Sequence, residues 1–597
     1  MSRLQYASDS LVNRIKSAVV SNYAAYSYCL SLILYKRGQK EQAYKLLDSS
    51  IEAVDKLKDS LSNNQNITEN RQKLAAQFYF LYQKKVEYLL EEGYVTQAFS
   101  VADKAKNSLG EAVEVDHFGL GGFFSAVFGM LSNLGVGSNS IQLGVDYKTK
   151  LKLSENKLEL YFRAWKFLYK KTFSIFRNNK RFSPFADDLD ETNARLHERL
   201  CEIIEDHTLV ISWYLCSDFL CVFLIDRYND KPLILKSSYD QYLGLPDWLD
   251  KYQNCIRNQD AKAITKELEN LLKEGTSLLQ IDRAIDEFYD PRKHKKLIIV
   301  PHRYLNVFPI HIFSVITGSQ KTYLRDLFPN GVIFSPSCGF VLSSRIGPTT
   351  NYYDQGSFIA LKNPALPYGD IEVRTIGKNF RESEIVDGTY VEEYTKKEMS
   401  GRPDSTESMI LFMKLSKARY IHFACHGGFF PKNPLKSSLA LTNSVYGMWS
   451  LEMLLNYNFS DCRLAVLSAC VTGVTDTEDY ASTYLSLAYA FLCNGCFNVV
   501  CSLWNVDDRA TAILMIRFYE YLTSDMYCSI PRALSHAQAW LRDSTASELK
   551  QWITDQAWTR RDKADAKAAI ERSASNDSEK PYSSPFYWGS FYSVSKE

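Results

Sequence analysis

The sequence predicts a helical N-terminal region followed by an α/β domain that is built on a mostly parallel sheet. From residue 12 to about residue 106, apolar residues recur at spacings of three and four, as on one face of a helix. From about residue 209, short β-branched and aromatic runs alternate with helical stretches, a pattern typical of parallel strands covered on both faces. We place the boundary near residue 195, with the helical region at 1–195 and the α/β domain at 196–597.

The composition indicates an intracellular protein. The chain has 597 residues, and its 70 Lys and Arg balance 69 Asp and Glu, which excludes a dedicated nucleic-acid binder and a polybasic membrane protein. The 13 cysteines are scattered and odd in number, as in reduced compartments. The first residues lack the apolar core of a signal peptide, and no run of about 18 apolar residues follows. We therefore expect a soluble, cytoplasmic protein with no membrane span.

Two stretches of the helical region look alike, at 26–43 and 80–98. In each, a glycine (Gly38 or Gly93) ends one helix, and an alanine five residues later begins the packed face of the next. The pattern resembles tetratricopeptide repeats, whose helix pairs stack into a solenoid. The two glycines are 55 residues apart instead of about 34, which predicts degenerate or interrupted repeats with an insertion at 59–70. A plain antiparallel helical bundle is the alternative.

Two further segments complete the helical region. Residues 116–144 are rich in glycine and apolar residues and lack Lys and Arg. We interpret them as a flexible loop whose phenylalanines dock on a neighbour, because a membrane-touching segment usually has basic residues as an anchor. Residues 151–177 are predicted to form an aromatic-rich helix. The basic residues at its end indicate a solvated surface, with an RNA contact as the alternative.

The α/β domain begins with a predicted hairpin, residues 209–215 and 220–225. Five short apolar strands follow, separated by helical stretches, at residues 297–300, 357–361, 420–424, 464–467 and 498–501. We divide the domain into a first half at 196–400, which contains the hairpin, and a second half at 401–597.

Two strands of the second half end in residues that can carry covalent chemistry. One ends in Cys425-His426-Gly427-Gly428 and the other in Ser468-Ala469-Cys470. Because ligands bind at the carboxyl ends of parallel strands, we expect His426 and Cys470 at the same edge. A thiol beside an imidazole supplies a nucleophile and a proton carrier for acyl transfer. Gly427 would allow a sharp turn and present its N–H, which with the N–H of Cys470 would bind a developing oxyanion.

The same two residues have a second interpretation on their own, since buried free cysteines and hydrogen-bonded histidines are common core residues. Their wider context favours the chemical interpretation. Six segments in order resemble the signature segments of CHAT-domain proteins, which are caspase- and separase-like cysteine peptidases. The resemblance covers roughly residues 200 to 597. Its segments are Leu297-Ile298-Ile299-Val300-Pro301 with Phe308-Pro309-Ile310, Ser335-Pro336-Ser337, Tyr420-Ile421-His422-Phe423-Ala424-Cys425-His426-Gly427, Leu464-Ala465-Val466-Leu467-Ser468-Ala469-Cys470, Ser502-Leu503-Trp504-Asn505-Val506-Asp507-Asp508, and Pro585-Phe586-Tyr587-Trp588-Gly589-Ser590-Phe591.

This resemblance implies that Cys470 is the nucleophile and that His426 is the general acid/base, which protonates the leaving amine more than it deprotonates the thiol. The group that orients His426 cannot be identified from the sequence. His422 is expected to be structural, because it lies roughly 13 Å back along the strand. Cys425, whose position alternates away from His426, is expected in the core.

No metal or cofactor is predicted. The segment Cys493-Asn494-Gly495-Cys496 has the spacing of half a zinc site, but no second pair lies nearby at ligand spacing. A thiol oxidoreductase is disfavoured because no Cys-x-x-Cys begins a helix beside the proposed site.

The predicted specificity of the substrate pocket depends on a position at which this sequence differs from separases. Separases, which cut after Arg, are expected to carry an acid shortly beyond the Trp motif, and the matching position here is Thr511 or Ala512. An arginine in a pocket without an acid would lose its solvation without gaining a partner. We therefore hypothesise that the cut follows an uncharged, medium-sized apolar residue. Three acids remain near the pocket in this register: Asp476, Asp507 and Asp508.

Together these residues predict a cytoplasmic cysteine endopeptidase that is gated through its helical region. Its partners are a protein substrate and a regulatory protein that docks on the stacked helices. The arrangement is similar to the TPR-CHAT subunit of type III-E CRISPR effectors and to CHAT proteases that cut bacterial gasdermins, which implies a role in bacterial immunity. The near-zero net charge predicts that any RNA dependence acts through a partner complex. The alternative from another class is a non-catalytic scaffold that binds a partner protein.

Overall fold

The structure is a computed structural model that describes residues 20, 23–60, 67–109, 196–257, 261–342, 356–399, 406–428, 436–454, 457–472, 487–504, 507–524 and 528–595. The predicted Gly-rich segment at 116–144, the predicted helix at 151–177 and Asp476 lie outside these residues. Within the described part of the chain, we find no helix with the length and apolar character that a membrane span requires.

The N-terminal region contains two pairs of helices. A helix over residues 23–36 precedes α2 (Lys40–Ser60), and α3 (Ile67–Glu91) precedes α4 (Val95–Leu109). Gly38 and Gly93 separate the members of each pair with φ angles of 78° and 81°, so the predicted left-handed turns are confirmed. Helices α2 and α3 have 21 and 25 residues and account for most of the long spacing. Residues 61–66 of the predicted insertion at 59–70 lie outside the described residues, and the insertion stays a prediction. The repeat interpretation itself stays a prediction.

Thirteen strands of the described residues form one sheet in the order β12-β11-β10-β13-β14-β15-β7-β4-β1-β2-β3, with β8 beside β10 and β9 beside β8. A separate hairpin joins β5 (Ser314–Thr317) to β6 (Gln320–Tyr323). The strands of the sheet are β1 (Thr208–Leu215), β2 (Leu220–Ile225), β3 (Leu233–Lys236), β4 (Lys296–Val300), β7 (Val332–Phe334), β8 (Ser357–Lys362), β9 (Glu382–Asp387), β10 (Tyr420–Gly428), β11 (Ser438–Ala440), β12 (Met448–Ser450), β13 (Leu464–Thr472), β14 (Asn498–Ser502) and β15 (Phe591–Ser595).

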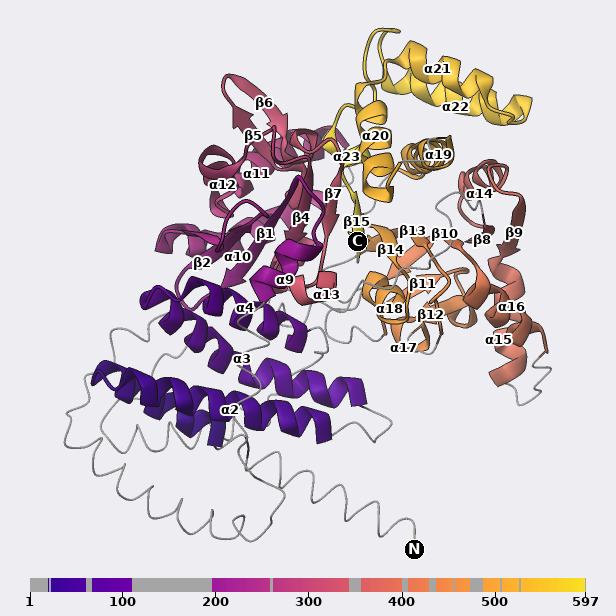
Figure 1. The fold of residues 1–597 in the computed structure, drawn as a ribbon. Helices are drawn as coiled ribbons and strands as arrows, with labels where there is room; N and C mark the ends of the chain where they lie inside the picture. The colour runs from indigo at the N-terminus through magenta and orange to yellow at the C-terminus, as the bar shows by residue number, and fades with distance from the viewer. Residues whose placement is uncertain are drawn as a thin grey trace, which may run out of the picture. The chain divides into compact units, whose positions relative to one another are not determined.

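The sheet consists of two similar halves that the last strand joins. The ladders β1–β4–β7 and β9–β8–β10–β13–β14 are parallel, as predicted. Each half also carries an antiparallel extension, β2–β3 beside β1 and β11–β12 beside β10, and the first of these confirms the predicted hairpin. Figure 1 shows β15 between β7, to which it is parallel, and β14, to which it is antiparallel. The sheet is therefore mixed, although most of its strands near the centre are parallel.

Helices cover the sheet and connect its strands. They are α9 (Leu196–Ile203), α10 (Tyr239–Arg257), α11 (Ala261–Leu278), α12 (Ile281–Phe288), η1 (Arg303–Val307), η2 (Ile310–Ile312), η3 (Leu324–Leu327), α13 (Cys338–Leu342), α14 (Gly369–Gly377), α15 (Gly388–Met399), α16 (Thr406–Lys417), η5 (Val445–Gly447), α17 (Leu451–Leu454), α18 (Leu487–Cys493), α19 (Asp508–Ser524), α20 (Ile530–Asp543), α21 (Ala546–Asp555), α22 (Arg560–Ser573) and α23 (Pro585–Trp588).

The N-terminal helices pack on the first half of the sheet. Alternate residues of β1 enter two different cores, because successive side chains of a strand point to opposite faces. Trp213 belongs to the core formed with α10 and α11, whereas Tyr214 belongs to the core formed with α3 and α4. In the second core the rings of Phe99 on α4 and Phe223 on β2 lie 5.4 Å apart. Residues before 110 therefore complete a layer of the α/β domain as well as forming helix pairs.

Buried polar side chains of α3 and α4 bind the main chain of this half. Lys106 Nζ donates to Ser212 Oγ at 2.7 Å and to the carbonyl oxygen of Val300 at 3.2 Å. Asp103 accepts from the N–H groups of Cys338 and Gly339, at the start of α13, at 2.6 and 2.7 Å. Each pairing satisfies polar groups that would be costly to leave unbonded in a core. The helices are thus fixed to the carboxyl ends of β1 and β4.

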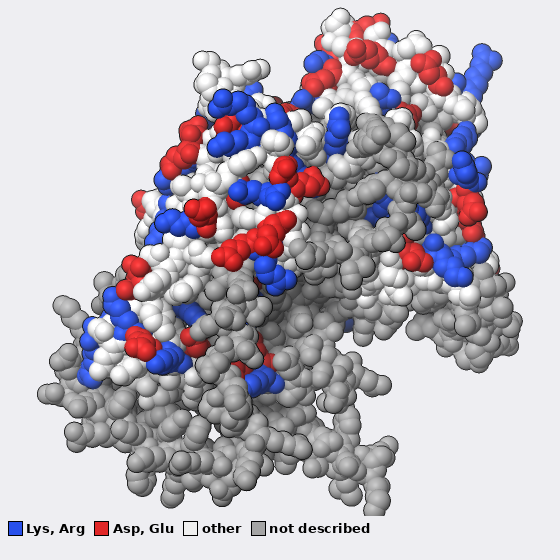
Figure 2. Space-filling model, viewed as in Figure 1, with Lys and Arg blue, Asp and Glu red and all other residues white. Residues whose placement is uncertain are grey.

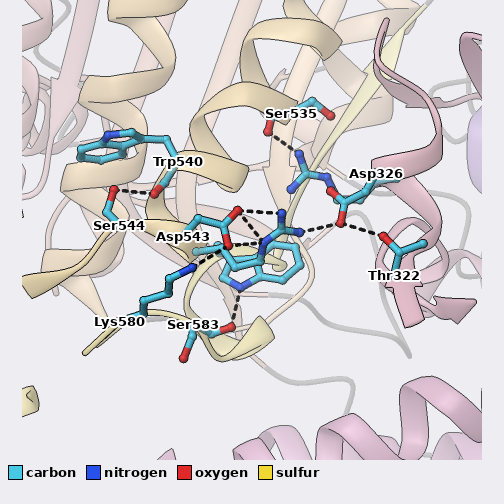
Figure 3. Close-up of polar contacts among 11 residues, drawn as sticks. Thr322, Asp326, Ser535, Trp540, Asp543, Ser544, Lys580 and Ser583 are labelled. Carbon is cyan, nitrogen blue, oxygen red and sulfur yellow. Dashed lines mark hydrogen bonds and ion pairs between the residues drawn. The ribbon is translucent and has the colours of Figure 1, made fainter. Parts of the chain in front are cut away.

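A cluster of arginines fixes the C-terminal segment to the first half. The guanidinium groups of Arg325 and Arg542 lie 5.5 and 5.4 Å from the ring centroid of Trp588, which shortly precedes β15. Arg542 also pairs with Asp326 at 2.6 Å and with Asp543 at 2.9 Å, as Figure 3 shows. Cation–π contacts with partly desolvated arginines are stabilising. They hold α20 and α23 where β15 must enter the sheet.

Candidate active site

The backbone register brings His426 and Cys470 together. In the parallel ladder between β10 and β13, His426 is the partner of Cys470, and the pairing continues to Gly428 and Thr472. Both residues lie near the carboxyl ends of their strands, at the edge that the sequence predicts. His426 is exposed to solvent, although its neighbours Cys425 and Gly427 are buried. An accessible imidazole therefore lies beside the backbone of a cysteine on the neighbouring strand.

Gly427 does not form the predicted turn. It lies inside β10, paired with Leu439 of β11 on one side and with Val471 of β13 on the other. Its φ angle is not in the left-handed region, unlike that of Gly38 or Gly93. The β11 hairpin explains the difference, because a second ladder continues β10 in extended conformation beyond the point where β8 ends.

His422 and Cys425 lie in the core, as expected. His422 is fully buried, and its Nε2 is 2.8 Å from Oε1 of Glu372 on α14. Its Nδ1 is 3.4 Å from the hydroxyl of Tyr519 on α19. Cys425 is 1% exposed. The pair formed by His422 and Glu372 is the closest acid–histidine contact of this half, and no residue spacing in the sequence revealed it, because Glu372 comes from a distant helix.

Asp508 is the first residue of α19, and its carboxyl group has a charge interaction with His426. Its Oδ2 accepts a hydrogen bond of 2.9 Å from the N–H of Tyr368, which directly precedes α14. Burial, followed by the charges of Glu372 and Asp507, raises the pKa of the Asp508 carboxyl. The Tyr368 N–H and, to the smallest extent, the charge of His426 act in the opposite direction. The sequence identified Asp508 only as an acid near the pocket. It did not predict the hydrogen bond that the N–H of Tyr368 donates to this acid.

The other proposed pocket residues are engaged in the helix or buried. Thr511 is 7% exposed and Ala512 is fully buried inside α19. The side chain of Asp507 accepts a 2.9 Å hydrogen bond from the N–H of Ala510 and so caps the first turn of α19. The assignment of Thr511 or Ala512 to the pocket stays a prediction.

Among the described residues, no group of three or more His, Cys, Asp and Glu side chains is arranged to hold a metal ion. Cys496 is fully buried, and its Sγ donates to the carbonyl oxygen of Asn498 at 3.2 Å. The cysteine side chains that the structure describes are free thiols.

The surface charge is mixed. Figure 2 shows Lys and Arg side chains interspersed with Asp and Glu side chains over the described part of one face. Many of these charges pair locally, as Lys362 does with Asp370 at 2.7 Å and with Asp387 at 3.3 Å. Interspersed charges of both signs create no extended field of one sign.

The chain is similar to known proteins in two comparisons. A family model described as the CHAT domain matches residues 262–596. Two crystal structures of the separase–securin complex from Saccharomyces cerevisiae are similar, with 11% and 10% sequence identity and TM-scores of 0.44 and 0.43. The similarity covers 83% and 87% of this chain but only 36% and 39% of the matched chains. This chain therefore spans little more than a third of their length. A search of curated proteins by sequence gave no match.

Proposed function

The chain belongs to the CHAT-domain family, and on that premise we propose that it is a cytoplasmic cysteine endopeptidase with Cys470 as the nucleophile and His426 as the general acid/base. The observation that carries the proposal is the β10–β13 register, in which these two residues are partners. The exposure of His426 supports it further, because a proton carrier has to reach the bound polypeptide.

The proposed reaction starts from a thiolate at Cys470 and an imidazolium at His426. The sulfur attacks the carbonyl carbon of the scissile peptide bond, and an S–C bond forms while the carbonyl oxygen becomes an oxyanion. The C–N bond then breaks, the imidazolium gives its proton to the leaving amine, and a thioester remains. His426, now neutral, takes a proton from water as the oxygen of that water attacks the thioester. The C–S bond breaks, an acid is released, and the thiolate and imidazolium are restored.

Backbone amides are the proposed donors to the oxyanion. We assign this role to the N–H groups of Cys470 and Gly427, and the loss of one such donor typically costs about 2.7–4 kcal/mol of barrier. Because Gly427 pairs with β11 and β13, its contribution requires the end of β10 to shift when a substrate binds.

The helical region is proposed to gate the site and to bind a regulatory protein. Its helices α3 and α4 are bonded to the ends of β1 and β4 through Lys106 and Tyr79, which gives a partner on these helices a mechanical connection to the sheet. The proposed setting is bacterial immunity, with a gasdermin-type pore former or a protein associated with type III-E CRISPR effectors as the substrate. The mixed surface charge favours indirect RNA dependence, through a partner complex.

The test compares wild-type protein with Cys470→Ala and His426→Gln in cleavage of a peptide library and of candidate partner proteins. The proposal expects cleavage by the wild type and loss of at least about 100-fold in each variant, since general acid–base groups typically contribute 10²–10⁴-fold. If both variants retain full biological activity while binding their partner, the scaffold function replaces the peptidase.

A further inference from the structure

His422 and His426 lie on the same face of β10. They are two strand repeats apart, so both positions point to the face that α14 and α19 cover. The contacts of His422 with Glu372 and Tyr519 show which parts of those helices lie above the deeper position. His426 lies four residues further along β10, roughly 13 Å closer to the carboxyl end of the strand.

The helix α19 runs in the opposite direction to β10. It follows β14, which is parallel to β13 and hence to β10, so α19 begins at the carboxyl edge and returns over the sheet. Asp508 precedes Tyr519 by about 16 Å along the helix axis, at 1.5 Å per residue. This rise closely matches the distance between His422 and His426. Since Tyr519 lies at the level of His422, Asp508 lies at the level of His426.

The carboxylate of Asp508 is held in place from the other side. The N–H of Tyr368 donates to it at 2.9 Å. The loop that leads to Tyr368 is fixed by Asn363, whose N–H donates to the carbonyl oxygen of Ala424 and whose Nδ2 donates to that of Ala440. Ala440 is the β11 partner of His426. Three elements therefore converge around His426: β11, the loop before α14, and the start of α19.

We propose that Asp508 is the positioning residue of His426: its carboxylate orients the imidazole and stabilises the imidazolium form that protonates the leaving amine. This inference rests on the proposed function and names the third group of the site. An anion fixed by a backbone N–H next to the imidazole favours the protonated ring through Coulomb attraction. It holds the proton until the leaving nitrogen needs it.

The other charged groups around His426 are engaged elsewhere. On α14, Glu372 is bonded to His422. On α19, Asp507 caps the helix and Nε of Arg509 donates to the hydroxyl of Tyr368 at 2.9 Å. On β8, Lys362 pairs with Asp370 and Asp387. Of the described carboxylates named here, Asp508 is therefore the one that we assign to His426, and we expect the pH dependence of the site to follow this pair.

The experiment compares Asp508→Asn with wild type and with Asp370→Asn. The Asn side chain keeps an acceptor for the Tyr368 N–H and removes the charge. With a peptide substrate taken from a library, we expect kcat to fall at least about tenfold with little change in KM. The alkaline limb of the pH–rate profile should move to lower pH by about one unit. Asp370→Asn removes an acid of the neighbouring helix α14 and should leave the profile of the wild type. Asp508→Glu, which restores the charge, should recover part of kcat.

A second readout does not depend on cleavage. The rate at which iodoacetamide alkylates Cys470, followed by mass spectrometry across pH, reports the thiolate that the imidazolium stabilises. We expect both His426→Gln and Asp508→Asn to slow alkylation several-fold near neutral pH. If His426→Gln slows it and Asp508→Asn does not, the role of Asp508 is overturned and the peptidase proposal stands. If neither variant changes alkylation, the Cys470–His426 pair itself is refuted. A loss of kcat in Asp508→Asn with an unmoved alkaline limb shows a purely structural role and also overturns the inference.

Discussion

The ammonium group of Lys106 on α4 donates a hydrogen bond of 2.7 Å to the hydroxyl oxygen of Ser212 on β1, inside the core that joins the helical region to the sheet. A second bond goes to the carbonyl oxygen of Val300. A lysine that is fully withdrawn from water holds its charge at a cost, and the hydrogen bonds and the nearby carboxylate of Asp103 offset part of it. The joint between the two regions is therefore sensitive to pH.

Lys106→Met should abolish one component of the pH dependence of stability. Burial lowers the pKa of Lys106 to about 8, whereas a lysine in the unfolded chain keeps a value of about 10.4. Between these values the unfolded state binds more protons than the folded state. This group therefore makes the free energy of unfolding rise with pH, by up to about 1.4 kcal/mol per pH unit.

The measurement is urea unfolding of wild type and Lys106→Met at about pH 7.5 and about pH 9.5, on either side of most of this titration. Buried tyrosines titrate in both proteins, so their contribution cancels in the difference between the two free energies of unfolding. We expect the stability of the wild type relative to the variant to grow by about 2 kcal/mol over this range. A difference that stays constant would show that Lys106 titrates normally.

Glu372→Leu should destabilise the second half strongly. The carboxylate of Glu372 and the imidazole of His422 are 2% and 0% exposed and 2.8 Å apart, so the substitution leaves a buried polar ring without its partner. Removal of one member of such a pair costs about 3 kcal/mol. The double variant Glu372→Leu with His422→Phe should regain most of this loss, because no polar group is then orphaned.

The matched control is Glu384→Leu, which breaks an exposed pair with Lys414 at the similar length of 2.7 Å. Exposed pairs contribute less than about 1 kcal/mol. Thermal unfolding of these three variants and the wild type distinguishes the cases. Equal losses for Glu372→Leu and Glu384→Leu would show that water reaches the His422 site.

Local patterns predicted most of the elements of this fold. The hairpin of β1 and β2 and the strands of the parallel ladders are visible as β-branched runs, because strand residues buried on both faces must be apolar throughout. The turns at Gly38 and Gly93 were predictable because a left-handed residue after a helix selects glycine. Helix length was not predictable, since no signal marked where α2 ends and α3 begins, and the extra residues were interpreted as an insertion.

Contacts between distant segments could not be predicted in the same way. Asp103 and Lys106 are charged residues on an amphipathic helix, a pattern that usually indicates a solvated face, and only the docking of α4 on β1 and β4 buries them. At the candidate site, the sequence identified which strand ends carry His426 and Cys470. The proposed placement of Asp508 at the level of His426 depends on the direction of α19 over the sheet and on the hydrogen bond from Tyr368, and no spacing in the sequence encodes either.

The proposed peptidase should cut after an uncharged residue. The carboxylate of Asp508 accepts from the Tyr368 N–H and is proposed to orient His426, and that of Asp507 accepts from the Ala510 N–H. Neither of these two described carboxylates is therefore available to pair with an arginine of the substrate. Burying an arginine without an acidic partner is costly. Profiling with a peptide library is the measurement. Strong selection for Arg or Lys before the cleaved bond would contradict the hypothesis.

Gly331→Ala should cost far more stability than Gly318→Ala. Both glycines have positive φ angles, 95° and 63°, so each substitution carries the penalty of about 1–2 kcal/mol for a left-handed alanine. A Cβ at Gly318 would meet no atom within 4 Å, whereas a Cβ at Gly331 would lie 2.6–2.8 Å from backbone atoms of Pro531 and Arg532 on α20. Backbone at a helix start moves only together with the helix, and overpacking adds about 1–3 kcal/mol. Urea unfolding should therefore separate the two variants by at least about 1 kcal/mol. Equal losses would mean that α20 can move away from β7 at no cost, and that the close approach of the C-terminal segment to the first half of the sheet contributes nothing to stability.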